Sequence, residues 1–305
     1  MQRFTNILFI CDPLINALPA LQRAVQLART NEAKLTITNV RDELPGTLLK
    51  LQKTFIQSQK DELHSLLKDI STEGLDIKIQ PLTGTPFLEV IKEVARNSYD
   101  LVIKPTEGRS GISSMLFGST DLHLMRKCPC PVWIIKPSKR KRFQRILAAV
   151  DPDPQEKTNA ELNTLILDLA TSLAAQDHSE LHIMHAWSMA YESSLRSGHV
   201  RIPKSEVDRM VLDTRKNHKR WLDELLTNYD LKDLSSKIHL LKGNPGESIP
   251  ALAKKKRIDL IVMGTVARTG IPGFIIGNTA EKILMAADSS ILAVKPESFS
   301  TPVKN

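Results

Sequence analysis

The sequence is poor in cysteine and has no long apolar run. Its 305 residues include only three cysteines, Cys11, Cys128 and Cys130. A sparse, odd set without framework spacing excludes a disulfide scaffold and is typical of compartments in which thiols stay reduced. Apolar runs such as residues 260–263 hold no more than about five residues, whereas roughly 20 are needed to span a bilayer. The first 13 residues lack a signal-peptide layout, so we expect a cytoplasmic protein without a membrane segment.

Motifs of covalent and phosphoryl-transfer chemistry are missing as well. The sequence contains no Gly-x-Ser-x-Gly elbow, no Walker-type lysine loop and no Ser, His and Asp in the order of a nucleophilic triad. Asp12 and Asp151 each follow an apolar run, but neither has a partner acid or base in its own loop. We therefore expect no catalytic residue and regard any slow nucleotide hydrolysis as incidental.

Residue types that bind metals occur in two places, and neither matches a metal motif. His178, His182 and His185 are close in sequence, but on a strand His182 and His185 point to opposite faces. Cys128 and Cys130 are separated by one residue, which is too short a spacing for a zinc or thioredoxin-type motif. We expect no metal site.

The formal net charge is +8, and basic residues are concentrated in two runs. Residues 139–142 follow Lys-Pro-Ser and are typical of an exposed linker, whereas residues 254–257 close an expected helix, where cations stabilise its dipole. Neither run is accompanied by interleaved aromatics, zinc spacing or a helix-turn-helix pattern. The charge therefore does not predict a specific nucleic-acid partner.

An internal repeat organises the chain. Residues 84–137 pair without a gap with residues 243–296, at a constant offset of 159. The beginnings of the two halves, residues 6–13 and 145–152, also match. Identical positions include Gly84/Gly243, Pro86/Pro245, Asp100/Asp259, Arg109/Arg268, Gly111/Gly270, Gly118/Gly277, Thr120/Thr279 and Lys136-Pro137/Lys295-Pro296. We predict a first domain at 1–137, a basic linker at 138–142, a second domain at 143–298 and a tail at 299–305.

Each copy alternates short apolar runs with segments of helical period, which predicts βαβ units and a parallel sheet. In the first copy the apolar stripe of Leu21, Ala24, Val25 and Ala28 indicates a buried helix face. The predicted fold class is α/β, with two tandem doubly wound, five-stranded parallel sheets of order 3-2-1-4-5. The expected strands are residues 7–11, 35–40, 77–82, 101–104 and 132–136, then 146–150, 181–186, 238–242, 260–263 and 291–295.

In such sheets a ligand lies outside the carboxyl ends of the strands, where the winding direction reverses. With the predicted order, that crevice lies between the first and fourth strands. The loop after the fourth strand leads to a helix that starts near Gly118 or Gly277. Backbone amides at a helix start, together with its positive dipole end, form an anion site.

These loops resemble the universal stress protein family, which carries Gly, two residues, Gly, nine residues, Gly and then Ser or Thr after its fourth strand. The corresponding residues of the second copy are Gly264, Ala267, Gly277 and Asn278, and those of the first are Pro105, Gly108, Gly118 and Ser119. The resemblance covers both halves and is greatest to the E-type tandem members of proteobacteria. It implies a Rossmann-like fold, related to adenine-nucleotide α-hydrolases, and ATP phosphates bound at this loop in nucleotide-binding members.

The resemblance also implies that Asp151 faces the adenosine and that the backbone at Ala186 lines the base pocket, with Asp12 and Val40 as first-copy equivalents. The expected cofactor-binding residues are Asp151, Ala186, Met263, Gly264, Ala267, Gly277, Asn278 and Thr279. In the first copy Pro105 removes a backbone donor and Glu107 adds a negative charge, which disfavours ATP there. In the second copy the glycines either hold a nucleotide or only shape a tight connection between strand and helix. A vestigial pocket, or a pocket for an apolar ligand, is a further alternative.

We therefore expect a non-catalytic, cytoplasmic stress-response protein that binds a ligand. The resemblance adds an association with resistance to DNA-damaging agents, and pairing of the two copies through their last strands, with a homodimer left open. One alternative is an ATP-binding or slowly ATP-hydrolysing enzyme on the same scaffold. Another is a carrier of a lipid-like ligand, with a cavity walled by Phe9, Met115, Leu116, Phe117 and Trp133.

Overall fold

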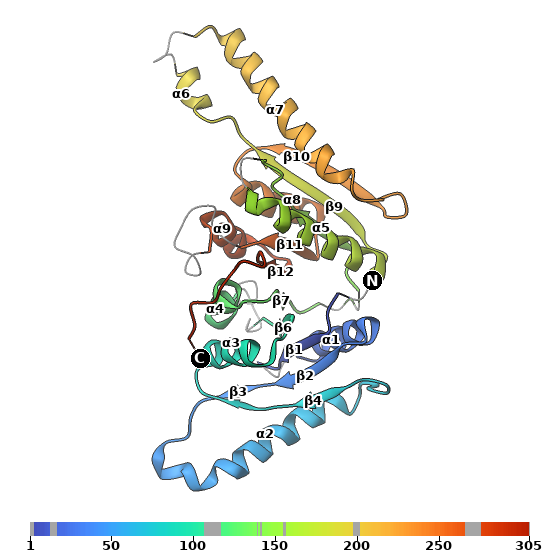
Figure 1. Ribbon diagram of the computed structural model, residues 1–305, viewed down its shortest axis with the longest axis vertical. Coiled ribbons are helices and arrows are strands. Elements are labelled where there is room, and N and C mark those ends of the chain that lie inside the picture. Colours follow the sequence, from blue (N-terminus) through green and yellow to red (C-terminus); the bar gives the residue numbers. More distant parts are fainter. Residues whose placement is uncertain are drawn as a thin grey trace. The chain divides into compact units, whose positions relative to one another are not determined.

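The computed structural model describes residues 3–12, 17–106, 117–138, 140, 142–154, 157–197, 202–265 and 276–304. The chain forms two compact units (Figure 1). Unit 1 comprises Met1–Arg142, Thr265–Gly277 and Asp288–Asn305, and unit 2 comprises Phe143–Gly264 and Asn278–Ala287. The second sequence copy therefore contributes two of its segments to unit 1.

Unit 1 contains the sheet that the first copy predicts. Its parallel strands have the order β4-β2-β1-β6-β7, which is the predicted 3-2-1-4-5. The strands are β1 (Asn6–Ile10), β2 (Lys34–Thr38), β4 (Ile77–Ile79), β6 (Leu101–Pro105) and β7 (Val132–Ile135). Two short strands, β3 (Val40–Arg41) and β5 (Leu82–Thr83), form a separate parallel pair.

A sixth strand joins the main sheet of unit 1 from the second copy. β12 (Ser290–Val294) pairs antiparallel with β7, and Leu292 lies opposite Trp133. Both strands are fully buried apart from slight exposure of Ile135, and both are the last strands of their copies. The copies therefore pair through their last strands, and the fifth strand of the second copy belongs to unit 1 rather than to unit 2.

The helices of unit 1 differ in how much of their surface they bury. The predicted stripe of α1, Leu21, Ala24, Val25 and Ala28, is fully buried. α2 buries Leu63 but leaves Phe55 48% exposed, and η2 with the adjoining part of α2 extends away from the sheet (Figure 1). The helices are α1 (Ala17–Asn31), η2 (Gly46–Leu51), α2 (Gln52–Leu67), α3 (Pro86–Asn97) and α4 (Ser119–Lys127).

Unit 2 repeats the first four strands of this arrangement. Its parallel strands have the order β10-β9-β8-β11, which is 3-2-1-4. They are β8 (Arg145–Ala149), β9 (Glu180–Trp187), β10 (Ser236–Lys242) and β11 (Leu260–Gly264). The predicted parallel α/β class is confirmed in both units.

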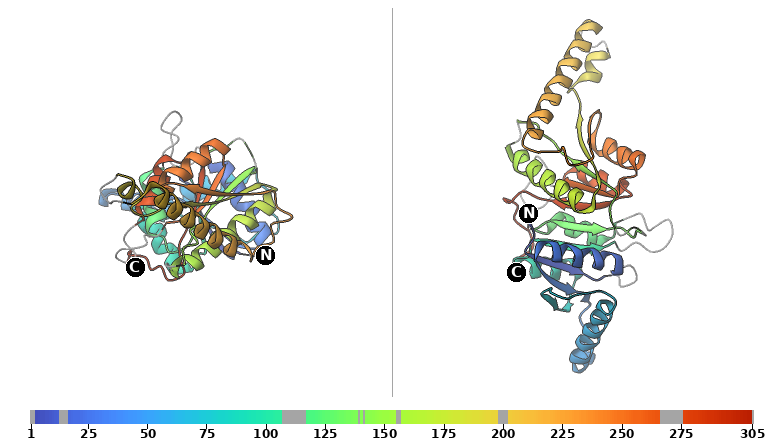
Figure 2. Two further views of the ribbon diagram at one scale, coloured as in Figure 1. Left: turned by 90° about the horizontal axis from the view of Figure 1, so that it is seen from above. Right: turned by 90° about the vertical axis from the view of Figure 1, so that its right-hand side faces the viewer.

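The helical connection between β9 and β10 is longer than its first-copy counterpart between β2 and β4. α6 and α7 extend away from the sheet (Figures 1 and 2), and α7 returns to contact β9. None of the helices in the described ranges is both long and apolar enough to cross a membrane. The helices are α5 (Lys157–Asp177), α6 (Glu192–Arg196), α7 (Lys204–Leu226), α8 (Pro245–Lys256) and α9 (Asn278–Ala286).

The repeated aspartates have the same structural role in both units. Asp100 Oδ2 accepts hydrogen bonds from the amides of Thr5, at 2.6 Å, and Asn6, at 3.2 Å. Asp259 Oδ2 accepts from the amides of Gln144, at 2.7 Å, and Arg145, at 3.0 Å. Each carboxylate therefore anchors the beginning of the first strand to the beginning of the fourth, which explains why the residue recurs.

Candidate functional site

The candidate crevice of unit 1 is bordered by a buried ion pair. Lys104 Nζ on β6 lies 2.8 Å from Asp121 Oδ1 in the first turn of α4, and both side chains are 0% exposed. Asp121 Oδ2 also accepts a hydrogen bond of 3.1 Å from the amide of Gly118, and Lys104 Nζ donates to the Pro105 carbonyl. A carboxylate of the chain itself therefore occupies the helix start, where an external anion would otherwise be stabilised.

The second copy does not repeat this ion pair. The positions equivalent to Lys104 and Asp121, at the offset of 159, are Met263 and Ala280. Both are buried, at 3% and 4% exposure. The charged pair was missed in the sequence, although comparing the copies position by position would have revealed that a Lys and an Asp are replaced together by apolar residues.

Asp151 follows β8 and is held in place through its backbone. Its amide donates to Asn163 Oδ1 at 2.8 Å, and Asn163 Nδ2 donates back to the Asp151 carbonyl at 2.8 Å. Asn163 comes from α5 and is buried. The Asp151 side chain stays 32% exposed, with its Oδ1 3.9 Å from His185 Nδ1. Two hydrogen bonds thus position a carboxylate at the strand end.

Gly264 ends β11 against a side chain of α5. A Cβ atom on Gly264 would lie 2.4 Å from Leu162 Cδ2, closer than carbon atoms approach. Any larger residue here would therefore force the Leu162 side chain to move. Leu162 is half-buried and lies where the resemblance places phosphates. This contact supports the interpretation that the glycine shapes the strand-to-helix connection.

The other predicted residues are distributed over several elements. Ala186 lies on β9, half-buried, and Met263 lies on β11. Asn278 and Thr279 begin α9 and are exposed. Gly277 belongs to unit 1, and its amide donates to the Thr265 carbonyl at 3.1 Å. Ala267, like Gly108 of the first copy, lies outside the described residues.

Unit 2 therefore brings together Asp151, Ala186, Met263 and Gly264. They occupy the carboxyl ends of the adjacent strands β8, β9 and β11, with the order β9-β8-β11. This edge is where ligands bind in doubly wound sheets.

A histidine pair beside Asp151 was not predicted. His185 Nε2 lies 2.8 Å from His218 Nδ1 of α7, and His185 Nδ1 lies 3.2 Å from the Val150 carbonyl. Burial, followed by the charge of His218, lowers the pKa of His185 to about 4. The rings of Trp187 and Trp221 surround His218, with centroids 6.0 and 4.8 Å away. Together these side chains form an aromatic cluster at the end of β9, in which His185 and Trp187 are buried.

His182, which was predicted to point away from His185, belongs to a separate pair. Its Nδ1 lies 2.9 Å from His239 Nε2 on β10, and its Nε2 lies 2.8 Å from Glu180. Among the described residues no group of three or more His, Cys, Asp or Glu side chains converges on a point suitable for a metal ion.

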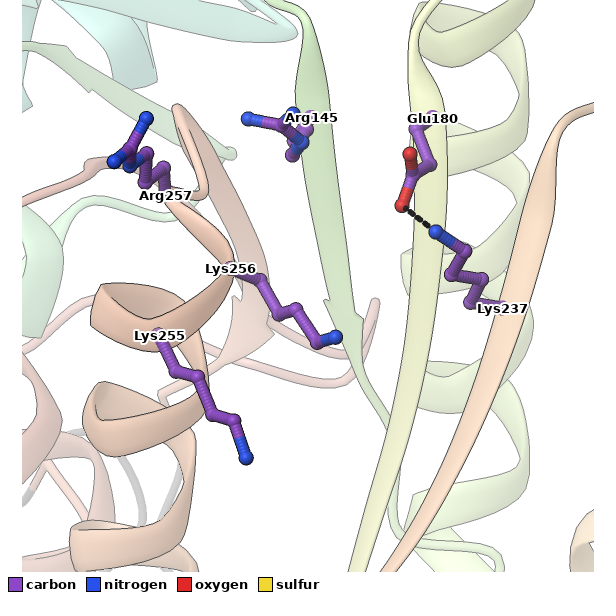
Figure 3. Close-up of a pocket in the computed structure, with 6 residues that line it drawn as sticks. All are labelled: Arg145, Glu180, Lys237, Lys255, Lys256 and Arg257. Carbon is purple, nitrogen blue, oxygen red and sulfur yellow. Dashed lines mark ion pairs between the residues drawn. The ribbon is translucent and has the colours of Figure 1, made fainter.

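A basic pocket of about 350 Å³ lies in unit 2 at the amino ends of the strands, on the side away from the candidate crevice (Figure 3). It is formed by the beginnings of the strands β8, β9 and β10 and by the end of α8. Its single carboxylate, Glu180, is 2.7 Å from Lys237 Nζ. The lining residues are Arg145, Glu180, Lys237, Lys255, Lys256 and Arg257. The basic run at 254–257 thus closes a helix, as predicted, and lies away from the candidate crevice.

The apolar residues considered as walls of a lipid cavity belong to the core. Phe9 and Trp133 are 0% exposed, and Phe117 is 8% exposed. Met115 and Leu116 lie outside the described residues. Burial of this kind is ordinary for large apolar side chains of a central sheet.

Comparison with known proteins identifies the family. The sequence pattern of the universal stress protein family matches twice, at residues 3–136 and 142–295. The chain belongs to the universal stress protein family. The two matches correspond to the two sequence copies, so the chain carries tandem universal stress protein domains.

Individual relatives support this assignment over the full chain. Universal stress protein E of Escherichia coli K12 is 29% identical over 317 aligned positions, covering all of this chain and 98% of that protein. A homologue of universal stress protein E in Haemophilus influenzae is 28% identical and covers 96% of this chain and 98% of its own length. The E-type, tandem resemblance is thus confirmed.

Two solved structures confirm the fold. A universal stress protein of Archaeoglobus fulgidus superposes with a TM-score of 0.62 at 17% identity, covering 95% of this chain and 98% of that one. A functionally unknown protein of Pseudomonas aeruginosa PAO1 reaches a TM-score of 0.70 at 23% identity, covering 97% and 94%. At these identities the likeness concerns the fold alone.

Proposed function

We propose that this chain is a non-catalytic, cytoplasmic stress-response protein that binds one small ligand, an adenine nucleotide such as ATP, in unit 2. Membership of the universal stress protein family supports the stress-response role. The expected association with resistance to DNA-damaging agents rests on the E-type resemblance alone.

The observation that carries the proposal is the difference between the two copies. In unit 1 the start of α4 is occupied by Asp121, which Lys104 neutralises at 2.8 Å. A phosphate there would face a buried carboxylate, and repulsion between like charges in a poorly solvated site is costly. The equivalent positions in the second copy, Met263 and Ala280, are uncharged. The second crevice therefore lacks this internal competitor.

Asp151 and the end of β9 supply the groups that recognise a nucleoside. A carboxylate accepts hydrogen bonds from the hydroxyl groups of a ribose, and Asp151 is positioned for this by its two backbone bonds to Asn163. The backbone of Ala186 would contact the adenine base, next to the aromatic side chain of Trp187. Asn278 and Thr279, exposed at the start of α9, would contact the phosphates together with the positive helix end.

Leu162 limits the affinity at the phosphate end. It packs against Gly264 and is half-buried, so a phosphate approaching the end of β11 would have to displace it. We therefore expect weaker binding of ATP than an unobstructed glycine loop would give.

Slow nucleotide hydrolysis is a second candidate function, with Asp151, whose side chain is 32% exposed, as the base that accepts a proton from water. His185 is not suited to this role, because its side chain is 1% exposed and both of its ring nitrogens contact protein atoms. In the hydrolase alternative, phosphate would be released continuously under excess ATP, and Asp151→Ala would abolish the release. The binding proposal predicts no turnover in wild type.

The proposal is tested by titration calorimetry of full-length protein with Mg-ATP. The variants are Asp151→Ala and, as the matched control in the first copy, Asp12→Ala. We expect one site per chain, lost in Asp151→Ala and retained in Asp12→Ala. Two sites, no binding, or loss in Asp12→Ala alone would each overturn the proposal. Native mass spectrometry of the purified chain adds an independent result, because a co-purifying lipid would favour the carrier instead.

A further inference from the structure

Two thiols of unit 1 lie within reach of one another between α4 and β7. Cys128 ends α4, and Cys130 precedes β7, with a single proline between them. Their sulfur atoms are 3.6 Å apart. Both residues are buried, with exposures of 0% for Cys128 and 7% for Cys130. A small rotation of either side chain would bring the sulfurs to the 2.03–2.05 Å typical of a disulfide bond.

A buried lysine faces this pair. Residues of β12 and β7 pair so that Ala293 lies opposite Val132, and continuing this antiparallel register by two residues places Lys295 opposite Cys130. Lys295 is 4% exposed, and its Nζ has no hydrogen-bond partner among the residues that the structure describes. Its Nζ lies 5.1 Å from the centre of the Phe299 ring. Because an unsatisfied buried amine is costly, a nearby thiolate would stabilise it.

The repeat provides an internal comparison. Lys136 is the equivalent lysine of the first copy; it is 8% exposed, and its Nζ lies 4.8 Å from the ring of Phe117. The same antiparallel register places Lys136 opposite Ser289, the position equivalent to Cys130. The position equivalent to Cys128 is Ala287. The buried lysine with an aromatic neighbour thus occurs twice, but the thiols occur only opposite Lys295.

The electrostatics assign different roles to the two thiols. Burial opposes ionisation of Cys128, but the hydrogen bond from Cys130 and the charge of Lys295 outweigh it and lower the Cys128 pKa. The hydrogen bond to Cys128, followed by burial, raises the pKa of Cys130. A thiolate is the reactive form of cysteine, so Cys128 is the nucleophile and Cys130 the thiol that resolves its product.

We propose that Cys128, Cys130 and Lys295 form a peroxide-reactive dithiol site that closes reversibly to a disulfide. The Cys128 thiolate attacks one oxygen of hydrogen peroxide, so that an S–O bond forms, the O–O bond breaks and the leaving hydroxide takes a proton from the Lys295 ammonium. Cys130 then attacks the sulfenic sulfur, the S–S bond forms, and the hydroxyl group leaves as water with a proton. Two thiols are oxidised and one peroxide is reduced to two waters.

Reversal requires a dithiol reductant, which opens the disulfide by exchange. A ring closed over a single intervening residue is short, and disulfides constrained in this way are the readily reduced, regulatory ones. The site contains no residue of the candidate nucleotide crevice, so it is testable without any nucleotide.

The test is oxidation of the reduced, full-length chain by hydrogen peroxide, followed by denaturation, alkylation and peptide mass mapping. We expect a mass loss of about 2 Da on the peptide that contains Cys128 and Cys130, reversed by dithiothreitol. Cys11 should remain alkylatable, because burial, followed by the charge of Asp12, raises its pKa to about 12. Oxidation of Cys11 at the same rate, or no oxidation at the pair, would overturn the proposal.

Lys295→Met should slow the oxidation at least about tenfold, whereas the matched variant Lys136→Met should leave the rate within about twofold. Equal oxidation rates in the two variants would show that Lys295 has no part in the reaction. If Lys295→Met fails to fold, Cys130→Ser decides the question. In that variant the reaction should stop at a sulfenic acid on Cys128, trapped by a 1,3-dione probe; no trapping there would contradict the proposed order of steps.

Discussion

Lys104 and Asp121 form an ion pair of 2.8 Å in which both side chains are fully buried. The pair joins the end of β6 to the first turn of α4 and places a carboxylate where the first copy would otherwise present a phosphate site. In the second copy the equivalent residues are Met263 and Ala280, so the two crevices differ in charge although the strands around them follow the same order.

Removing one partner of the ion pair should destabilise the protein, whereas replacing both partners by apolar residues should change its stability little. Lys104→Met leaves the Asp121 carboxylate buried without a cation, which should lower the free energy of unfolding by about 3–5 kcal/mol. The double variant Lys104→Met/Asp121→Ala introduces the residues of the second copy and should recover most of this loss. Urea unfolding measures both. The control is Arg41→Met, because Arg41 pairs with Glu62 at the surface and should change the stability by less than about 1 kcal/mol. A double variant as unstable as the single one would contradict this account.

The contact between Gly264 and Leu162 should make two substitutions interdependent. Gly264→Ala places a Cβ atom 2.4 Å from Leu162 Cδ2 and should destabilise unit 2 by about 1–3 kcal/mol through overpacking. In a Leu162→Ala background the same substitution should cost much less. A double-mutant cycle from denaturant unfolding measures the coupling, and additive effects would show that the two residues do not interact.

Leu162→Ala should also change ligand binding. The smaller side chain opens the phosphate end of the crevice, so the affinity for Mg-ATP should rise several-fold, while that for adenosine should change little. Titration calorimetry with the two ligands separates these effects. An equal gain for both would place Leu162 near the nucleoside instead of the phosphates.

His185 should make the stability depend on pH. Its folded-state pKa, about 4, lies below its usual value of 6.5, because burial and the charge of His218 oppose protonation. The neutral histidine therefore contributes stability that is fully present above pH 6.5 and lost as the pH falls toward 4. A shift of this size corresponds to roughly 3 kcal/mol. His185→Gln should reduce the difference in unfolding free energy between pH 7 and pH 4; parallel profiles for the variant and the wild type would refute this.

The starts of α3 and α8 provide a matched pair of helix caps. Asn244 Oδ1 accepts a hydrogen bond from the Gly246 amide at 2.8 Å, whereas the Thr85 side chain makes no capping bond. Asn244→Ala should therefore cost about 1 kcal/mol of stability, and Thr85→Ala clearly less. Thermal unfolding of the two variants measures both losses of stability. A greater loss in Thr85→Ala than in Asn244→Ala would contradict the prediction.

The repeat and the hydrophobic period predicted the fold because strand and helix formation depend on local patterns. The ten expected strands were found to within a few residues, and their order in unit 1 is the predicted 3-2-1-4-5. The pairing of β12 with β7 was expected from the family resemblance and not from any local pattern, because it joins segments that are distant in the sequence.

The candidate site was predicted less completely. Asp151 and Gly264 lie at strand ends, as the pattern indicated, but the role of Gly264 depends on Leu162, which only the packing of α5 on β11 brings near. The pairing of His185 with His218 joins residues 33 positions apart, on β9 and α7. Contacts of this kind follow from tertiary packing rather than from spacing along the chain.

The central claim, that only unit 2 accepts the nucleotide, is tested most directly by photolabelling. The full-length chain is irradiated with an 8-azido-adenine nucleotide, in the presence and absence of excess ATP, and the labelled peptides are identified by mass spectrometry. We predict ATP-protected labelling of the β9 peptide around Ala186 and none around Val40. Equal labelling of both peptides, or labelling confined to Val40, would contradict the account.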